Sequence, residues 1–378
     1  MTPIYLDNAA STKVSDEVLA LMTEVMRTTW GNASSNHPQG AAARDVIATA
    51  RARLLAALGD PNGTIGDIVW TSGCTESDAL AVLGAARPRE GHVVASSIEH
   101  AAVTETARHS GREVVLVEPG PDGVLDPDAV AAAAKGAAVV AIVMVQNEVG
   151  VVQPIAAITS AARKANGKAH LHVDAAQAFG KVALDASTLG ADSIALAPHK
   201  MHGPKGVGAL WLRHGATVEP LWVGGGQQKG LRGGTQDAPG AAGFGLAAER
   251  AVAALASART RWLELAGLVT QKLDARGIAY RQLVPDFRRA PHILALGIPG
   301  VPANALRTVL SSRGVYISTG SACADQGAHG AASPVLVALG LAEDAGMVRL
   351  SFGLDTTSTE VEAAADILAD VIAGLRNA

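Results

Sequence analysis

The sequence AHLHVDAAQAFGKVALDASTLGADSIALAPHK, residues 169–200, contains two short apolar runs, each followed closely by a charged side chain. The runs at 169–174 and 193–197 have the length and composition of buried strands. Functional groups in parallel sheets lie just beyond the carboxyl ends of the strands. Asp174 and Lys200 occupy such positions.

Strands and helices alternate through most of the chain, as they do in βαβ units. The predicted strands lie at 67–70, 92–97, 113–117, 138–145, 169–174, 193–197 and 208–213. The predicted helices between them lie at 42–58, 76–86, 126–135, 155–166 and 185–189. This order predicts an α/β fold with a large domain built on a mostly parallel sheet.

The pattern changes from about Gly240. An alanine-rich amphipathic stretch over 240–277 ends at a glycine, as a capped helix does, and is predicted to join two domains. Strands are then predicted at 292–298, 315–319 and 347–353, with a terminal helix from Ser358. We expect a large domain over 15–255, and a smaller α+β domain formed by 1–14 and 256–378.

Composition limits the classes of function. The 378 residues carry a formal net charge of −4 without a long basic run, which argues against a surface for nucleic acid or membrane. The sequence has neither a signal-peptide pattern nor an apolar stretch of about 18–20 residues. Two cysteines, Cys74 and Cys323, are typical of a reduced compartment. We expect a cytoplasmic protein that acts on a small molecule.

Three further strand ends carry polar residues. TSGCTES (71–77) is a glycine turn that leads into a helix, with Thr75 at the helix start. Exposed N–H groups and the helix dipole favour a phosphate there, although Thr and Glu at a helix start are also a routine cap. His100 and Asn147 each follow another strand, where a structural histidine and a turn asparagine are the simpler interpretations.

Asp174 and Lys200 indicate a functional site more specifically than these residues do. A carboxylate at the end of a strand buried on both faces needs a partner, because burying it unpaired is unfavourable. Asp174 either caps the following turn or pairs with a protonated ring nitrogen of a cofactor, and Gln177 could face the same crevice. Lys200 could form a Schiff base with the aldehyde of an anionic pyridine cofactor. Lys205, in a Gly-Pro-Lys-Gly turn, is expected to be a solvated charge.

Ten sequence blocks resemble, in order, those of the cysteine desulfurases, which are pyridoxal-phosphate enzymes of the class V aminotransferase fold (fold type I). The blocks are YLDNAAST (5–12), GNASSNHPQG (31–40), TSGCTES (71–77), EH (99–100), NEVG (147–150), HVDAAQAFGK (172–181), HKMHGPKGVGAL (199–210), GGGQQKGLRGGT (224–235), STGSACA (318–324) and VRLSFG (348–353). Because they span nearly the whole chain, the resemblance implies a seven-stranded large-domain sheet and pyridoxal 5′-phosphate as cofactor, with no metal.

The resemblance implies a role for each matching residue. Lys200 would anchor the cofactor covalently and Asp174 would pair with its pyridine nitrogen. His100 would stack on the ring and assist proton transfer, Gln177 would contact the phenolic oxygen, and Asn147 would lie beside cofactor and substrate. The phosphate would be held by Cys74, Thr75, His199 and Thr235. Thr235 reaches the neighbouring subunit's cofactor in this family, which implies a homodimer.

The resemblance also implies the reaction. Arg349 would receive the carboxylate of L-cysteine, a task that suits its guanidinium fork. Cys323, in a mobile loop over about 318–334 like that of the family's group I, would take sulfur as a persulfide and leave L-alanine. Sulfur-acceptor proteins, such as those of iron–sulfur cluster assembly or thiolation, would be the partners. A selenocysteine lyase, or another C–S lyase or aminotransferase of this fold, is the nearest alternative.

One departure from the family pattern precedes the lysine. The family usually has Ser-Gly-His-Lys where this chain has Ala197, Pro198, His199 and Lys200. Ala197 supplies no hydroxyl for a phosphate, and Pro198 removes a backbone N–H donor. Either other donors compensate, or the affinity for the cofactor is lower. The departure also motivates an alternative of another class, a non-catalytic paralogue that acts as a scaffold.

Overall fold

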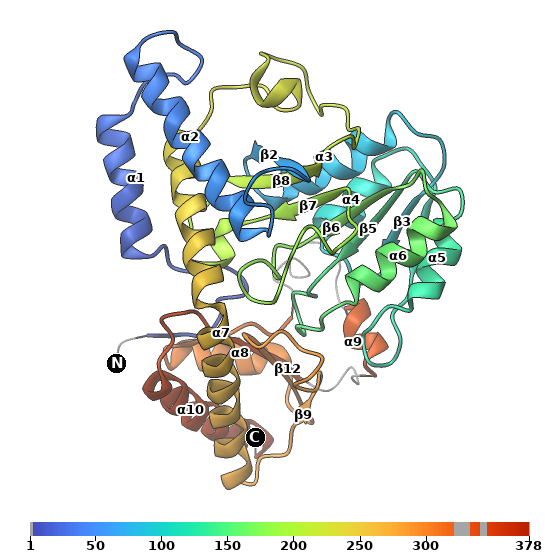
Figure 1. Cartoon of the computed structure of the whole chain (residues 1–378). Coiled ribbons are helices and arrows are strands. Elements are labelled where there is room, and N and C mark those ends of the chain that lie inside the picture. The colour runs from blue at the N-terminus through green and yellow to red at the C-terminus, as the bar shows by residue number, and fades with distance from the viewer. Residues whose placement is uncertain (1–2, 321–332, 341–345, 378) are drawn as a thin grey trace.

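The computed structural model describes residues 3–320, 333–340 and 346–377. Its largest element is a seven-stranded sheet (Figure 1). From edge to edge the strands are β2 (Gly66–Thr71), β8 (Gly208–Arg213), β7 (Ser193–Leu196), β6 (His170–Asp174), β5 (Val139–Val143), β3 (Val93–Ser96) and β4 (Val114–Val117). Only β8 runs antiparallel to its neighbours. The prediction of a mostly parallel seven-stranded sheet is confirmed, and all seven strands lie where the apolar runs placed them.

Helices cover both faces of this sheet. They are α1 (Asp16–Thr28), α2 (Pro38–Ala57), α3 (Cys74–Ala86), α4 (Ala101–Arg108), α5 (Pro127–Ala134), α6 (Ile155–Ala165) and α7 (Ala238–Ala275). Alternate residues of β5 enter opposite layers of the core, since strand side chains alternate between the two faces. Val139 and Ala141 pack with α3 and α4, whereas Val140 and Ile142 pack with α2, α5, α6 and α7. The strands are therefore buried on both sides, which explains their unbroken apolar runs.

The helix predicted at 185–189 is wrong. This segment is a turn in which the Asp185 carboxylate accepts hydrogen bonds from the backbone N–H and the hydroxyl of Ser187. An aspartate that binds the backbone two residues later favours a turn over a helix. Two of the helices that cover the large sheet were not predicted, α1 and the short α4. The Ser15 hydroxyl caps α1 by accepting from the Val18 N–H, a signal present in the sequence.

The C-terminal part of the chain forms a second, smaller set of strands and helices. Its elements are β9 (Arg281–Gln282), β10 (Ile293–Ile298), α8 (Ala303–Ser312), β11 (Val315–Tyr316), α9 (Pro334–Ala338), β12 (Gly346–Ser351) and α10 (Ser358–Arg376). An antiparallel sheet has the order β12-β10-β9, and β11 pairs in parallel with β1 (Ile4–Tyr5). The predicted helix over 240–277 corresponds to α7, and Gly277 follows it with a φ of +64°. The terminal helix from Ser358 is also confirmed.

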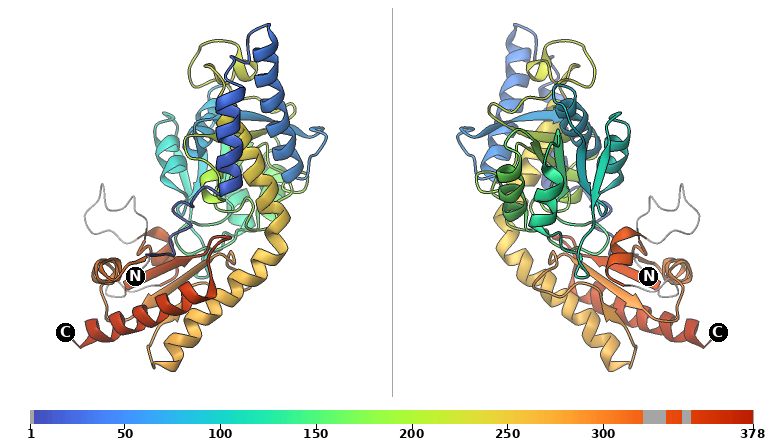
Figure 2. Two further views of the ribbon diagram at one scale, coloured as in Figure 1. Left: turned by 90° about the vertical axis from the view of Figure 1, so that its left-hand side faces the viewer. Right: turned by 90° about the vertical axis from the view of Figure 1, so that its right-hand side faces the viewer.

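Figure 2 shows α7 running from the part with the seven-stranded sheet into the part formed by the C-terminal chain. We propose that the large domain covers 15–255 and that 1–14 and 256–378 form the small one. Two hydrophobic clusters support this division, because Ala251 of α7 packs in the larger cluster and Ala258 in the smaller. Leu6 also belongs to the smaller cluster. None of the helices in the described ranges combines the length and apolar character needed to cross a bilayer.

Candidate active site

Asp174 lies at the carboxyl end of β6, beside β7, whose continuation carries Lys200. The Asp174 side chain is buried, and its residue is only 4% exposed. Its Oδ1 accepts a hydrogen bond from the Ala176 N–H at 2.9 Å and lies 3.7 Å from the Cys74 Sγ, whose thiol donates. Asp174 therefore caps the following turn, as one interpretation predicted. These bonds use only Oδ1, and no hydrogen bond to the second oxygen is found among the described residues.

The Lys200 amine meets the N-terminal segment. Nζ donates to the Ala9 carbonyl oxygen at 2.7 Å, and the Gln177 Nε2 donates to the same oxygen at 2.6 Å. Burial, and next to it the charge of the nearby Arg349, lower the pKa of Lys200 to about 8, while Asp174 opposes the shift. Lys200 therefore loses its proton much more readily than an ordinary lysine, and about a tenth of it is the neutral, nucleophilic amine at pH 7. The structure thus brings Lys200 and Gln177 together.

Arg349 lies on β12 at the edge of the same site. Its Nη1 donates to the Asn147 carbonyl oxygen at 2.7 Å, and its Nη2 donates to the Asp7 carboxylate at 2.5 Å. Asn147 lies in a turn, as the sequence indicated, and its backbone rather than its side chain makes this contact. Sequence reasoning missed Asp7 and Ala9, although both fall in the block YLDNAAST that carried part of the resemblance.

His100 is the N-cap residue of α4. Its Nδ1 accepts a hydrogen bond from the Ala102 N–H at 3.1 Å, which is the structural role that the simpler interpretation of the sequence gave it. Burial lowers the pKa of His100, while Asp174 raises it. The imidazole is therefore neutral at pH 7, with Nε2 carrying the proton because Nδ1 is the acceptor. The cap leaves that Nε2–H free to act as a donor.

The start of α3, where the sequence predicts an anion site, has the free helix end that such a site needs. Cys74 and Thr75 are its first two residues, and no side chain caps this end, so its N–H groups remain available. A Cβ on Gly208 would lie 2.5 Å from the Gly73 backbone, so the β8 start needs glycine there. Burial raises the pKa of Cys74 well above its usual value, so this thiol stays protonated.

His199 lies next to Lys200 on the turn η1 (Pro198–Lys200), with its Nδ1 3.3 Å from the Ser11 hydroxyl. Burial, and next to it the charge of Lys200, lower the pKa of His199 to about 4, so the ring is neutral and can donate from one nitrogen. Pro198 is buried at the first position of the turn. A missing N–H is tolerated there, because that position has no partner within the turn. Ala197 is fully buried and contributes no polar group.

His202 is a residue that sequence reasoning left without a role. Its Nδ1 donates to the Lys13 carbonyl oxygen at 2.9 Å, and its Nε2 accepts from the Leu354 N–H at 3.0 Å. Its own N–H donates to the Thr12 hydroxyl at 2.7 Å, and its φ is +63°, a strained value for a non-glycine residue. His202 therefore ties the Lys200 turn to the N-terminal segment and to the C-terminal part of the chain.

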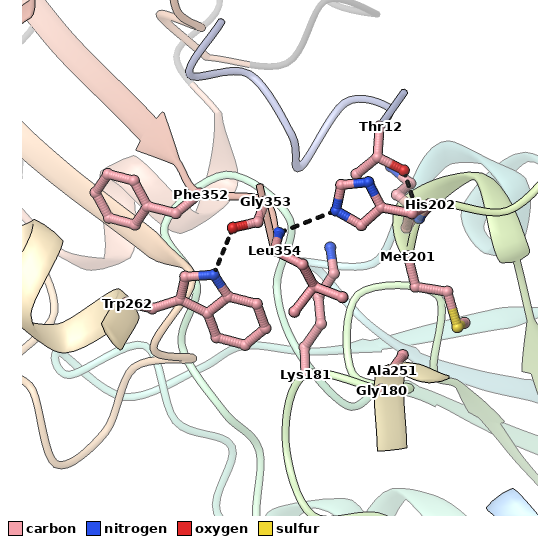
Figure 3. A pocket seen from close by; sticks show the side chains of 11 residues that line it. Thr12, Gly180, Lys181, Met201, His202, Ala251, Trp262, Phe352, Gly353 and Leu354 are labelled. Carbon is pink, nitrogen blue, oxygen red and sulfur yellow. Dashed lines mark hydrogen bonds between the residues drawn. The ribbon is translucent and has the colours of Figure 1, made fainter. Parts of the chain in front are cut away.

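A small pocket lies behind this turn. Thr12, Gly180, Lys181, Lys200, Met201, His202, Ala251, Trp262, Phe352, Gly353 and Leu354 line it. The Lys181 amine points into it (Figure 3). Lys181 is 4% exposed, and its Nζ has no hydrogen-bond partner among the described residues. Burial lowers the pKa of Lys181 well below its usual value, and Lys200 and Arg349 add to the effect.

Replacing Lys181 with methionine is expected to raise the free energy of unfolding by about 1–3 kcal/mol at pH 7, because an unpaired buried amine is lost. The unfolded chain binds a proton on Lys181 that the folded protein does not, so the wild type gains stability as pH rises toward about 10. The difference in the free energy of unfolding between wild type and Lys181→Met should therefore become smaller between pH 7 and pH 10. Calorimetric melting at pH 7 and pH 10 measures it. The exposed Lys205→Met is the control, and a lower melting temperature for Lys181→Met at pH 7 would contradict the expectation.

The remaining predicted residues are less closely connected. Thr235 is exposed, on the segment between the turn η2 (Gln227–Gly230) and α7. None of the hydrogen bonds found in the described ranges links it to Lys200 or Asp174. Cys323 lies outside the described residues. Direct contacts or a shared partner thus join Lys200 with Gln177, Asp174 with Cys74, and Asn147 with Arg349. These pairs lie close together, because Arg349, Asp174 and Cys74 all shift the pKa of Lys200, and His199 is linked through the N-terminal segment.

A lysine and an aspartate at the ends of adjacent strands, beside a helix start that can hold a phosphate, define a fold type I enzyme that depends on pyridoxal phosphate. The chain belongs to the class-V aminotransferase family, whose model matches residues 4–364.

Two of its relatives match over nearly their whole length. "Cysteine desulfurase IscS 1" of Archaeoglobus fulgidus is 34% identical over 99% of this chain and 98% of that protein. "Cysteine desulfurase" of Cereibacter sphaeroides is 36% identical over 100% of this chain and 97% of that protein. Among solved structures, a "NifS-like protein" is 31% identical with a TM-score of 0.89, covering 99% of this chain and 100% of that one. A structure titled "SspA in complex with cysteine" is 31% identical with a TM-score of 0.78, covering 92% and 98%.

The residues present fit pyridoxal phosphate. The Gln177 Oε1 is buried and has no partner in the described part of the chain, as expected where a polar group of a ligand completes the site. The uncapped start of α3 offers N–H groups to a phosphate, and neutral His199 offers a further donor. Because these donors are present, the departure at Ala197 gives no reason to infer a site without cofactor.

Proposed function

We propose that this protein is a cysteine desulfurase, which converts L-cysteine into L-alanine and transfers the sulfur to Cys323 as a persulfide. The proximity of Lys200, Asp174 and Arg349 carries this proposal, because the charges of Asp174 and Arg349 both act on the Lys200 amine, which joins a cofactor anchor to a receptor for an amino-acid carboxylate. Relatives named cysteine desulfurase match the chain from end to end, and a similar structure was solved with cysteine.

When bound, pyridoxal phosphate supplies an aldehyde that joins an amine and a ring that stores the electrons released at the substrate's α-carbon. Lys200 would anchor it, and Asp174 would keep a proton on the pyridine nitrogen through the oxygen that the Ala176 and Cys74 contacts leave open. His100 would cover the ring, Gln177 would contact the phenolic oxygen and Asn147 would lie beside the substrate. The phosphate would be held by Cys74, Thr75, His199 and, from the neighbouring subunit, Thr235.

Arg349 binds the carboxylate of L-cysteine, and the Lys200 amine takes the proton from its α-carbon. The lowered pKa of Lys200, about 8, suits a base that must be neutral to accept this proton near neutral pH. The neutral His100, with its free Nε2–H, assists proton transfer beside the substrate. These groups therefore divide binding and proton transfer between them.

The Cys323 thiolate attacks the sulfur of the substrate, and a new S–S bond forms as the substrate's carbon–sulfur bond breaks. The electron pair of the broken bond stays with the carbon fragment, which takes up a proton and leaves as alanine. One cysteine and one enzyme thiol thus give alanine and one persulfide, without an external oxidant. Sulfur-acceptor proteins, such as those of iron–sulfur cluster assembly or thiolation, then receive the sulfur.

The working form in this proposal is a cytoplasmic homodimer. The exposure of Thr235 supports it, because a residue that reaches a second subunit's cofactor must face outward in one chain. The exposed apolar side chains Trp222 and Val223, which lie just before the turn η2, offer area for such an interface.

Replacing Cys323 with alanine is expected to lower alanine formation from L-cysteine by at least about 10³-fold, because the sulfur acceptor is removed. Alanine and sulfide are measured together in the presence of a thiol reductant. The absorbance of the bound cofactor should match that of the wild type, which shows that the variant is folded and loaded. Equal turnover by wild type and Cys323→Ala would contradict sulfur transfer to this cysteine.

A further inference from the structure

None of the residues that carry the proposed reaction lies in the N-terminal segment 5–12. Its backbone is fixed at Asp7, which forms a bridge with Ser351 and whose carbonyl oxygen accepts hydrogen bonds from the Tyr5 hydroxyl at 3.1 Å and the Ala10 N–H at 3.0 Å. The Asp7 carboxylate, in contrast, has one hydrogen-bond partner among the described residues, the Arg349 guanidinium. Its side chain is 23% exposed, so it can turn toward water while the backbone stays in place.

Arg349 has little capacity left for a ligand in this state. Its side chain is 5% exposed, with Nη1 bound to the Asn147 carbonyl and Nη2 to Asp7. The Nε is buried and unpaired within the described part of the chain. A bidentate carboxylate needs two N–H groups on one edge of the guanidinium. The edge formed by Nη1 and Nη2 is therefore occupied, on one side by backbone and on the other by Asp7.

We propose that Asp7 stands in for the substrate carboxylate on Arg349 and is displaced when L-cysteine binds, so that it sets the affinity for the amino acid. This inference rests on the proposed function, in which Arg349 receives that carboxylate. Two carboxylates on one guanidinium edge repel each other, and the Asn147 carbonyl is fixed by the chain, so Asp7 is the partner that must yield. Without ligand, Asp7 supplies the counter-charge that a buried arginine needs.

A purely structural role for Asp7 makes the opposite prediction. If Asp7 only orients the guanidinium, its removal weakens substrate binding. If it competes with the substrate, its removal strengthens binding while destabilising the ligand-free protein. If Asp7 competes with the substrate, its removal therefore raises the affinity for the substrate and lowers the stability of the ligand-free protein. If Asp7 only orients the guanidinium, its removal lowers both.

The experiment compares wild type, Asp7→Asn and Asp7→Glu as cofactor-loaded proteins. L-alanine, the product, is titrated by calorimetry, and the steady-state constants for L-cysteine are measured. For Asp7→Asn we expect the Kd for L-alanine and the KM for L-cysteine to fall about tenfold, with kcat within about twofold of wild type. Asp7→Glu keeps the charge and should stay near wild type. Weaker L-alanine binding by Asp7→Asn, or an unchanged Kd, would overturn the proposal.

Thermal unfolding of the same proteins without amino acid supplies a readout that is independent of turnover. Asp7→Asn should melt several degrees below wild type. Added L-alanine should raise the melting temperature of Asp7→Asn by more than it raises that of the wild type. The double variant Asp7→Asn/Arg349→Met should lose less stability than the sum of the single changes, because the pair is removed together. Asp16→Asn is the control, since this aspartate is 90% exposed on α1 and lies away from Arg349.

The stability measurements also separate this inference from the proposed function. A wild type that makes no alanine from L-cysteine would reject the desulfurase assignment, whereas additive effects of Asp7→Asn and Arg349→Met would reject the pairing. If Asp7→Asn does not fold, Asp7→Ser removes the same charge with a smaller side chain. A rise in the Kd for L-alanine in that variant counts against the proposal, as it does in Asp7→Asn.

Discussion

Replacing Lys200 with alanine is expected to lower alanine formation from L-cysteine by at least about 10³-fold. The variant loses both the covalent anchor of the cofactor and the amine that moves the α-proton, and general base catalysis alone contributes about 10²–10⁴-fold. The Ala9 carbonyl, which accepts from Lys200 at 2.7 Å, would keep its bond from Gln177, so the surrounding segment should hold its position. Alanine and sulfide are measured after reconstitution with pyridoxal phosphate.

Lys205→Ala is the matched control for this change. Lys205 lies five residues beyond Lys200 in the same glycine- and proline-rich turn, and it is exposed. Its replacement should leave turnover within about twofold of wild type, because a solvated surface charge contributes little. A Lys200→Ala protein that retains substantial activity, or a Lys205→Ala protein that loses it, would show that the two lysines were assigned the wrong roles.

Replacing Asp174 with asparagine is expected to lower turnover by about 10²–10⁴-fold. Asparagine has nearly the same size and can still accept from the Ala176 N–H, but it carries no charge to hold a proton on the ring nitrogen. Without that proton the ring stores the electrons from the α-carbon poorly. The rate of alanine formation and the absorbance of the bound cofactor as pH is varied report the two effects separately.

Asp185→Asn serves as the control for Asp174→Asn. Asp185 lies in an exposed turn that follows β6, where its carboxylate caps Ser187. Its replacement should affect neither the rate nor the absorbance. Near-wild-type turnover by Asp174→Asn would mean that the carboxylate only caps its turn, which was the other interpretation that the sequence allowed.

The seven strands of the large sheet were predictable because both faces of that sheet are covered. Burial on two sides makes each strand a continuous apolar run, and the polar residue that ends the run then marks the site, as at Asp174. The parallel order of β6 and β7 brings such ends together without further information. The roles of individual residues came instead from the family resemblance, since spacing alone favoured Lys200 over Lys205 only modestly.

Long-range contacts were not predictable in this way. Ala9 makes its contact with Lys200 through a backbone oxygen, and Asp7 binds Arg349, 342 positions away in the sequence. No local sequence pattern encodes either contact. The strained His202 likewise depends on the Lys13 carbonyl and the Leu354 N–H, which belong to distant segments. The turn at 185–189 was mistaken for a helix because its apolar spacing fits both, and the capping aspartate decided the outcome.

The pairing of the two ends of the chain has a consequence for synthesis on the ribosome. Ile4 lies beside Val315, and Asp7 lies beside Ser351 and binds Arg349, so these early residues lack their long-range partners until residues 315–351 have been synthesised. The sheet from 66 to 213 can assemble earlier, since domains generally fold as units during synthesis. The emerging chain thus holds an exposed, unfinished crevice until residues 315–351 follow.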